Sequence, residues 1–404
     1  MKNLVGCILT LALFHFYAAS PTTDIIAGTA MQIDKFPGTC PHITSDQQGN
    51  PVISWIRSTT DTSWAFCYAR SVDGGQTFSS PVIIPGTSNI QPHAENLPKV
   101  VFKPSGEIIA IWGASNPNTK NKYAGKIYYT QSFDEGRSWT ERKSLVNDTA
   151  GFDQRYFDVA LTPTGEAAMI WLDNRKTKKA EGSGLYFAIT EGSNGFAAER
   201  LISESCCQCC RTDLFIDSKS GIHVLYRGIV RDSIRDMVHA VSVDNGKTFS
   251  EPSRISDDNW VINGCPHTGP AMTENENGLH FAWFTGGKNK GCYYSSSSDN
   301  GDTFAPRDSV SRSGSHPQIT SFPNGRLLIG WDEVARKGDN FYKRIGLEIR
   351  NADGTGSKKS YITPDSLSAS YPVLATLGND KSLLAYTVFR ADKSFIEFQL
   401  VRVP

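Results

Sequence analysis

The sequence predicts an all-β protein, a β-propeller of seven four-stranded blades. Three observations lead to this prediction: an apolar run ending in an aromatic residue recurs along the chain, turns rich in glycine, asparagine, aspartate and proline separate such runs, and no long segment has the apolar period of a helix. Short β-rich runs at regular spacing are typical of blades around a central channel.

The repeat sets the number of blades. An apolar run ends in an aromatic residue seven times, and successive aromatic residues are 48 to 59 residues apart. They are Trp55, Trp112, Trp171, Tyr226, Trp283, Trp331 and Tyr386. A period of this length fits one four-stranded blade. Six blades with an appended hairpin are the alternative interpretation.

The two ends of the chain are expected to close the ring. The last copy has only three apolar runs, at 373–377, 383–389 and 395–403. Residues 24–31 form an isolated β-like run near the other end. We expect this segment to supply the missing fourth strand, because its pairing there removes an exposed sheet edge.

The first 20 residues are typical of a secretory signal peptide, which leaves 21–404 as a single propeller domain. Lys2 precedes an apolar run over 4–17, and Ala18, Ala19 and Ser20 follow it. We therefore expect a mature protein outside the cytoplasm, either periplasmic or secreted. No other stretch is long and apolar enough to span a bilayer.

The charge balance gives no electrostatic case for nucleic acid or an anionic membrane as a partner. The chain has 41 lysines and arginines against 41 aspartates and glutamates, for a formal net charge of +0. Binding to nucleic acid or to an anionic membrane surface relies on an excess of positive charge. We expect neither partner.

Four turns share the pattern Ser-x-Asp-x-Gly-x-Ser/Thr-aromatic. The copies lie at 71–78, 132–139, 242–249 and 297–304. In such a turn the aspartate accepts hydrogen bonds from backbone amides and the glycine adopts a positive φ. We expect these aspartates to be structural and not catalytic.

This pattern is the Asp-box, and the chain resembles the sialidase-like superfamily of Asp-box-repeat propellers over nearly all of its mature length. Sialidases of that superfamily are six-bladed glycoside hydrolases that hold a substrate carboxylate with three arginines and use a Tyr–Glu pair and an aspartate in catalysis. The resemblance implies that this chain, if an enzyme, is a glycoside hydrolase of exo-sialidase type. The early Arg-Ile-Pro motif of true sialidases is absent, and residues 36–42 stand in its place. No catalytic residue is therefore carried over from that family.

The loops opposite the Asp-box turns hold the candidate catalytic residues. Residues 227–236 place three arginines and two aspartates in one loop. A pocket for an anionic sugar would use an aspartate as general acid, with its pKa raised by burial. The candidates are Asp232, Arg227, Arg231, Arg235 and Arg211. A surface ion network is the alternative, and Tyr342 and Tyr371 both lie near the right face for a tyrosine nucleophile.

Cysteines and histidines enter the first strands on the same face. Two Cys-Pro-His units and a double-cysteine run suggest a site for copper or zinc, with Cys40, His42, Cys209, Cys210, Cys265 and His267 as ligands. The alternative is disulfides, because eight cysteines follow the signal segment and the expected compartment is oxidising. His93 and His316, taken singly, are expected to be structural.

The sequence thus favours an exported, sialidase-like propeller that binds a terminal sugar of a glycan, or another small anionic sugar, and as an enzyme hydrolyses it. A Cys/His metal-binding or redox propeller without glycosidase activity is the alternative. A non-catalytic recognition scaffold is the third.

Overall fold

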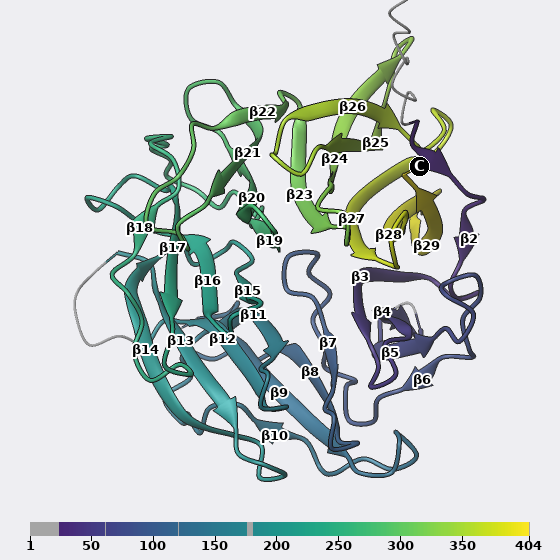
Figure 1. Ribbon diagram of the computed structural model, residues 1–404. Helices are drawn as coiled ribbons and strands as arrows, with labels where there is room; N and C mark the ends of the chain where they lie inside the picture. The colour runs from purple at the N-terminus through teal and green to yellow at the C-terminus, as the bar shows by residue number, and fades with distance from the viewer. Residues whose placement is uncertain (1–23, 61, 120, 176–180, 404) are drawn as a thin grey trace, which may run out of the picture.

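A computed structural model describes residues 24–60, 62–119, 121–175 and 181–403, so the predicted signal peptide lies outside the described residues. The described chain forms seven antiparallel sheets arranged as blades in a ring (Figure 1). The prediction of a seven-bladed propeller is confirmed, and the six-bladed alternative is wrong. Helix is absent from the described residues, so nothing helical within them is suited to crossing a membrane.

In blades 1 to 6 the four strands follow the chain order outward from the centre of the ring. Blades 1 and 2 consist of β3 (Gly38–Ser45), β4 (Pro51–Ser58), β5 (Trp64–Arg70), β6 (Val82–Ile83), β7 (Lys99–Phe102), β8 (Ile108–Ser115), β9 (Gly125–Ser132) and β10 (Lys143–Ser144). Blades 3 and 4 consist of β11 (Gln154–Leu161), β12 (Ala167–Asp173), β13 (Ser183–Thr190), β14 (Phe196–Cys206), β15 (Asp213–Ile216), β16 (Ile222–Arg227), β17 (Met237–Ser242) and β18 (Ser253–Arg254). Blades 5 and 6 consist of β19 (Ala271–Asn275), β20 (Gly278–Thr285), β21 (Gly291–Ser297), β22 (Asp308–Ser311), β23 (Gly314–Ser321), β24 (Leu327–Lys337), β25 (Asn340–Arg350) and β26 (Gly356–Tyr361).

Blade 7 is built from both ends of the chain. Its three inner strands are β27 (Ser368–Thr376), β28 (Lys381–Arg390) and β29 (Lys393–Arg402). The fourth is β1 (Ile26–Ala27), which pairs with β29 so that Ile26 faces Arg402 and Ala27 faces Val401. A second short strand, β2 (Met31–Gln32), also pairs with β29. The predicted closure by the N-terminal segment is confirmed.

The seven repeated aromatic residues form the core of the blades. Each lies in the second strand of its blade, and each is at most 1% exposed. Burying a large aromatic side chain in every blade contributes several kcal/mol per site, of the order of 3–5 kcal/mol judged by truncation to alanine. The repeat that predicts the fold is therefore also what holds each blade together.

The four Ser-x-Asp-x-Gly turns share one set of hydrogen bonds. In the first, Asp73 accepts from the Thr77 amide at 2.9 Å and from the Thr77 hydroxyl at 2.6 Å. The Ser71 hydroxyl oxygen accepts from the Gly75 amide at 2.8 Å. The bonds to the Thr77 side chain and backbone lower the pKa of Asp73 to about 2. The carboxylate therefore holds the turn in shape. This turn joins the third and fourth strands, on the face opposite the blade-to-blade loops.

The closure of blade 7 generates a testable prediction. A chain beginning at Asp34 should melt at a lower temperature than a chain beginning at Asp24, because β29 loses both partner strands and its edge is left unpaired. The measurement is thermal unfolding by circular dichroism together with light scattering at several concentrations. We expect the shorter chain to associate as concentration rises. Equal melting temperatures and no association would show that β1 and β2 contribute nothing to closure.

Candidate functional site at the mouth of the central channel

The first strands of the blades place two layers of side chains around the channel axis. The inner layer consists of one first-strand residue from each blade, the one that pairs with the residue just before the core aromatic. These residues are His42, Lys99, Asp158, Asp213, Ala271, Gln318 and Val373. The mouth layer lies two residues earlier in each copy: Cys40, Leu97, Tyr156, Arg211, Gly269, His316 and Tyr371. Because each first strand enters from the face that carries the blade-to-blade loops, the mouth layer is the nearer to that face.

Four residues of the mouth layer have a left-handed backbone. The φ angles are 59° at Cys40, 52° at Tyr156, 51° at His316 and 55° at Tyr371. In each of these strands the pairing register shifts at the same point. Such bulges re-aim a side chain, and positive φ at a non-glycine residue is uncommon and concentrates at functional sites. Their repetition in four blades indicates a common framework for presenting side chains at the mouth.

A histidine, an aspartate and a tyrosine form the most organised group at the mouth. His316 Nδ1 lies 2.7 Å from Asp332 Oδ2, and the amide of Tyr371 donates to the same oxygen at 2.8 Å. With Nδ1 donating to the carboxylate, Nε2 of His316 is the nitrogen that can accept a proton. The rings of His316 and Tyr371 are 4.1 Å apart between centroids. An oriented base thus stands directly beside a phenol.

The surroundings set the charge states of this group. Burial alone would raise the pKa of Asp332, but the charge and hydrogen bond of His316, with Lys343, hold that pKa below its usual value. Lys343 Nζ lies 3.4 Å from Asp332 Oδ1 and 5.5 Å from the centre of the Tyr371 ring. Burial, with the nearby charge of Glu95, raises the pKa of Tyr371 to about 12. The phenol therefore keeps its proton at neutral pH.

A second aromatic group at the mouth comes from the first strand of blade 3 and from the segments that lead into blades 2 and 5. His93 packs edge-on against Tyr156 with ring centroids 5.4 Å apart, and it lies 5.1 Å from the ring of His267. The amide of Glu95 donates to His93 Nδ1 at 3.2 Å, which leaves the proton of the neutral ring on Nε2. Burial and the charge of His267 lower the pKa of His93. His93 is thus a neutral hydrogen-bond donor.

Arg211 forms the floor beneath the mouth. Its guanidinium donates to the carbonyl oxygens of Gly269 at 3.4 Å, Pro270 at 3.0 Å and Pro317 at 3.4 Å. With the Gln318 amide turned to present its oxygen, that oxygen accepts from Arg211 at 2.7 Å. Glu95 lies 3.8 Å from the same guanidinium and accepts from the Gly269 amide at 2.6 Å. Arg211, a predicted catalytic residue, is therefore at the site but is bound to protein groups.

Charged residues fill the channel below this floor. A cavity of about 90 Å³ is lined by His42, Lys99, Asp158, Arg211, Asp213 and Gln318, together with four apolar residues. Lys99 Nζ lies 2.5 Å from Asp158 Oδ1. Burial and the charge of Asp158 raise the pKa of Asp213 to about 7. Burial, with the charges of Lys99 and Arg211, lowers the pKa of His42 well below its usual value.

The predicted loop of arginines and aspartates lies on the expected face, but its side chains do not gather in a pocket. Arg227 is 1% exposed and donates to the carbonyl oxygens of Phe284 at 2.8 Å and Thr268 at 3.2 Å. Arg235 donates to the Ile262 carbonyl oxygen. Arg231 and Asp232 are exposed at the loop tip, both with positive φ. The burial on which the general-acid hypothesis for Asp232 relied is missing, and its catalytic role stays a prediction.

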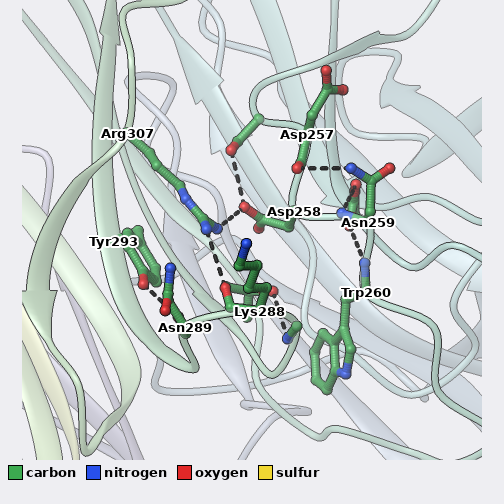
Figure 2. A network of polar contacts seen from close by, with 12 residues as sticks. Asp257, Asp258, Asn259, Trp260, Lys288, Asn289, Tyr293 and Arg307 are labelled. Carbon is green, nitrogen blue, oxygen red and sulfur yellow. Dashed lines mark hydrogen bonds and ion pairs between the residues drawn. The ribbon is translucent and has the colours of Figure 1, made fainter.

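A polar network on blade 5 anchors the segment that leads to His267 (Figure 2). Asp258 accepts from the indole of Trp283 at 2.7 Å and pairs with Arg307. Arg307 also donates to the Lys288 carbonyl oxygen at 3.2 Å. Trp260, two residues after Asp258, packs against the guanidinium of Arg227 at 4.8 Å. An ion pair and an aromatic contact therefore hold this segment in place.

The six predicted metal ligands do not form one site. Within the described residues, three or more histidine, cysteine or acidic side chains come close enough to share an ion only at Cys207, Cys209 and Cys210. Two of the predicted ligands, Cys209 and Cys210, belong to this group. The two Cys-Pro-His units are not equivalent. In the first unit Cys40 is the mouth-layer residue, whereas in the second His267 lies two residues before the mouth-layer residue, Gly269. Cys265 is exposed.

The eight cysteines of the described chain are all free thiols in this structure. Cys67 and Cys292 are buried in the third strands of blades 1 and 5. Disulfides among them stay a prediction.

The sequence could not choose between Tyr342 and Tyr371 as the tyrosine of the site, but the structure places only Tyr371 at the mouth. Tyr342 lies on β25, and its hydroxyl donates to Asp365 at 2.8 Å in an exposed contact. Tyr371 lies in the mouth layer beside His316. His316 and His93, which the sequence suggested were structural, both lie at the mouth. Sequence reasoning missed Tyr156, Glu95 and Lys343 there.

A hollow of about 490 Å³ lies on the other face. Its buried cation, Lys103, is 3.0 Å from Glu107 and 2.9 Å from Glu166, and it donates to the Gly192 carbonyl oxygen. These bonds join turns of neighbouring blades and leave Lys103 no free donor.

Comparisons with known proteins show the fold. No family model and no curated protein matches the chain. A protein of unknown function from Dyadobacter fermentans is 14% identical and covers 95% of this chain and 100% of its own, with a TM-score of 0.55. The polysaccharide lyase Uly1 is 11% identical over 92% of this chain and 91% of its own, with a TM-score of 0.56. An α-L-arabinofuranosidase from Fusarium graminearum, ARB93A, is 12% identical over 93% of this chain and 98% of its own, with a TM-score of 0.52.

The raised pKa of Asp213 generates a prediction about stability. A carboxyl group with a pKa of about 7 when folded and 3.8 as its ordinary value stabilises the fold below about pH 4 and loses that contribution as the pH rises to about 7. Asp213→Asn should therefore flatten the decline in stability between pH 4 and pH 7. Urea midpoints measured across this range test it, with Asp232→Asn at the exposed loop tip as the control. An unchanged slope in Asp213→Asn would contradict the prediction.

Proposed function

We propose that the channel mouth binds a glycan that carries a carboxylate and cleaves it by β-elimination. His316 is the base and Tyr371 is the acid. The observation that carries the proposal is the arrangement of Asp332, His316 and Tyr371: an imidazole with its tautomer fixed by a buried carboxylate stands 4.1 Å, between ring centroids, from a phenol that keeps its proton.

The reaction needs one proton removed and one supplied. Nε2 of His316 takes the proton on the carbon next to the carboxylate of a uronic acid residue. The electron pair left behind forms a carbon–carbon double bond, and the bond from the neighbouring carbon to the glycosidic oxygen breaks. The phenol of Tyr371 gives its proton to that leaving oxygen. His316 is left protonated, and its charge is stabilised by Asp332.

The negative charge that builds up on the substrate carboxylate needs donors near it. Lys343 supplies a cation close to Tyr371, and its side chain is 35% exposed, so it remains accessible. Neutral His93 supplies an Nε2–H donor from the second aromatic group. These two residues suit recognition of an anionic sugar, the ligand class that the sequence favours.

Hydrolysis fits the same geometry less well. A glycoside hydrolase ordinarily needs two carboxyl groups that flank the bond. Two carboxylates at the mouth, Glu95 and Asp332, are each 1% exposed on the side chain, and each accepts a hydrogen bond from a backbone amide. A tyrosine nucleophile needs its proton removed, whereas burial raises the pKa of Tyr371. Exo-sialidase-type hydrolysis, implied by the Asp-box resemblance, is the alternative outcome of the same test.

The proposal includes the compartment. Lys2, the apolar run over 4–17 and the small residues after it support export to the periplasm or the medium. Polysaccharides too large to enter a cell would be met there.

The test is an assay on a panel of uronic acid-containing polysaccharides. Cleavage by β-elimination creates a double bond conjugated to the carboxylate, which absorbs ultraviolet light, whereas hydrolysis creates reducing ends without it. We expect the ultraviolet signal. His316→Ala and Tyr371→Phe should each lower kcat by about 100- to 10,000-fold, because each removes one proton-transfer group.

Tyr342→Phe is the matched control, since Tyr342 makes its hydrogen bond to Asp365 outside the mouth. Its rate should equal that of the unaltered protein. Reducing ends without ultraviolet absorbance would replace elimination by hydrolysis. Full activity in both His316→Ala and Tyr371→Phe, or no cleavage of any member of the panel, would overturn the proposal.

A further inference from the structure

Three buried thiols meet at the turn between blades 3 and 4. Cys207, Cys209 and Cys210 follow the end of β14 and precede β15, and they are 1%, 4% and 1% exposed. Cys207 Sγ lies 3.6 Å from Cys209 Sγ and 4.0 Å from Cys210 Sγ. The turn therefore directs three sulfur atoms of one short segment into the interior.

These separations suit a shared metal ion better than a disulfide. A metal–sulfur bond of about 2.3 Å places two sulfurs on one ion roughly 3.8 to 4.0 Å apart, in tetrahedral or trigonal geometry respectively. The observed separations of 3.6 and 4.0 Å are close to this range. A disulfide requires about 2.05 Å, so two of the sulfurs would have to move together by more than an ångström.

A buried cation balances the charge that three thiolates would bring. Arg227 Nε donates to Cys210 Sγ at 3.3 Å, and the side chain is among the most completely buried in the protein. Three thiolates with a monovalent ion carry a net charge of −2, which the adjacent guanidinium halves. Without that neighbour the cost of burying the charge would be larger.

The donor set selects the ion. The group contains three sulfurs and, among the described residues, no histidine or acidic side chain as a fourth ligand. Zinc in structural sites almost always takes four ligands, whereas thiolates alone are the preferred donors of copper(I). The burial of all three sulfurs leaves little room for water to complete a tetrahedral zinc site.

We propose that Cys207, Cys209 and Cys210 bind one copper(I) ion with three sulfur ligands. This site is separate from the acid–base group of His316 and Tyr371. Arg227 joins the two regions, because the same guanidinium that contacts Cys210 also donates to the Thr268 carbonyl oxygen beside His267. The ion thus has a structural role, holding the loop that forms one side of the mouth.

The test loads the reduced protein, without air, with copper(I) supplied as its acetonitrile complex. We expect one copper per chain in competition with a chromophoric copper(I) chelator. Cys207→Ser, Cys209→Ser and Cys210→Ser should each reduce bound copper at least tenfold at equal free copper. Cys206→Ser, a buried neighbour outside the group, and Cys265→Ser, an exposed cysteine, should keep it.

X-ray absorption at the copper edge of the unaltered protein needs no variant, so a folding defect cannot obscure the answer. Three sulfur neighbours and no nitrogen neighbour would support the site. Nitrogen coordination would place the ion on histidine and overturn it. Preferential binding of zinc chloride, loss of two titratable thiols to a disulfide, or copper retained in all three variants would overturn it as well.

Discussion

Arg211 is the constraint on which the centre of the propeller depends. One guanidinium reaches carbonyl oxygens of blades 5 and 6, the amide oxygen of Gln318 and the carboxylate of Glu95 from blade 2. Gly269 makes this possible, since a Cβ there would lie 2.5 Å from the Cβ and carbonyl oxygen of Arg211. A buried arginine must have its donors satisfied, and the surrounding carbonyls do so only when the blades are in place.

Above this floor, the bulge in the first strand keeps the same backbone conformation in four blades while the side chain that it presents varies. The left-handed conformation recurs at Cys40, Tyr156, His316 and Tyr371, which carry three different kinds of side chain. A thiol, two phenols and an imidazole thus occupy equivalent backbone positions. The acid–base pair at blades 6 and 7 arises because two of these positions are adjacent and Asp332 binds both residues.

The fold could be predicted from the sequence because its main signal is local. One aromatic residue in each copy, with turns at fixed places, was enough for the blade count and the closure. The site was harder. The mouth-layer residue stands fifteen positions before the core aromatic in six of the seven copies, as with Cys40 and Trp55 or Tyr156 and Trp171. An alignment of the copies on that aromatic would have placed Tyr156, His316 and Tyr371 at the same position of the repeat.

Other parts of the site have no such signal. The density of charge in residues 227–236 suggested a pocket, but Arg227 turns inward to backbone carbonyl oxygens and Asp232 points to solvent. Side-chain direction in a loop depends on what packs beneath it, here Trp260 and the thiol group. Glu95 reaches Gly269 across the ring, a contact between residues 174 positions apart that no local pattern encodes.

The joining of β1 to β29 also has a consequence for the order of events in folding. Each of blades 1 to 6 is contiguous in sequence, so its strands can pair as soon as they are available. Blade 7 must wait for segments separated by nearly the whole chain, and contacts of such long range are slow to form. Until they meet, β29 presents an open edge, and the nearly finished ring is a species able to capture a second molecule. The last step of folding is therefore also the one in which concentration matters most.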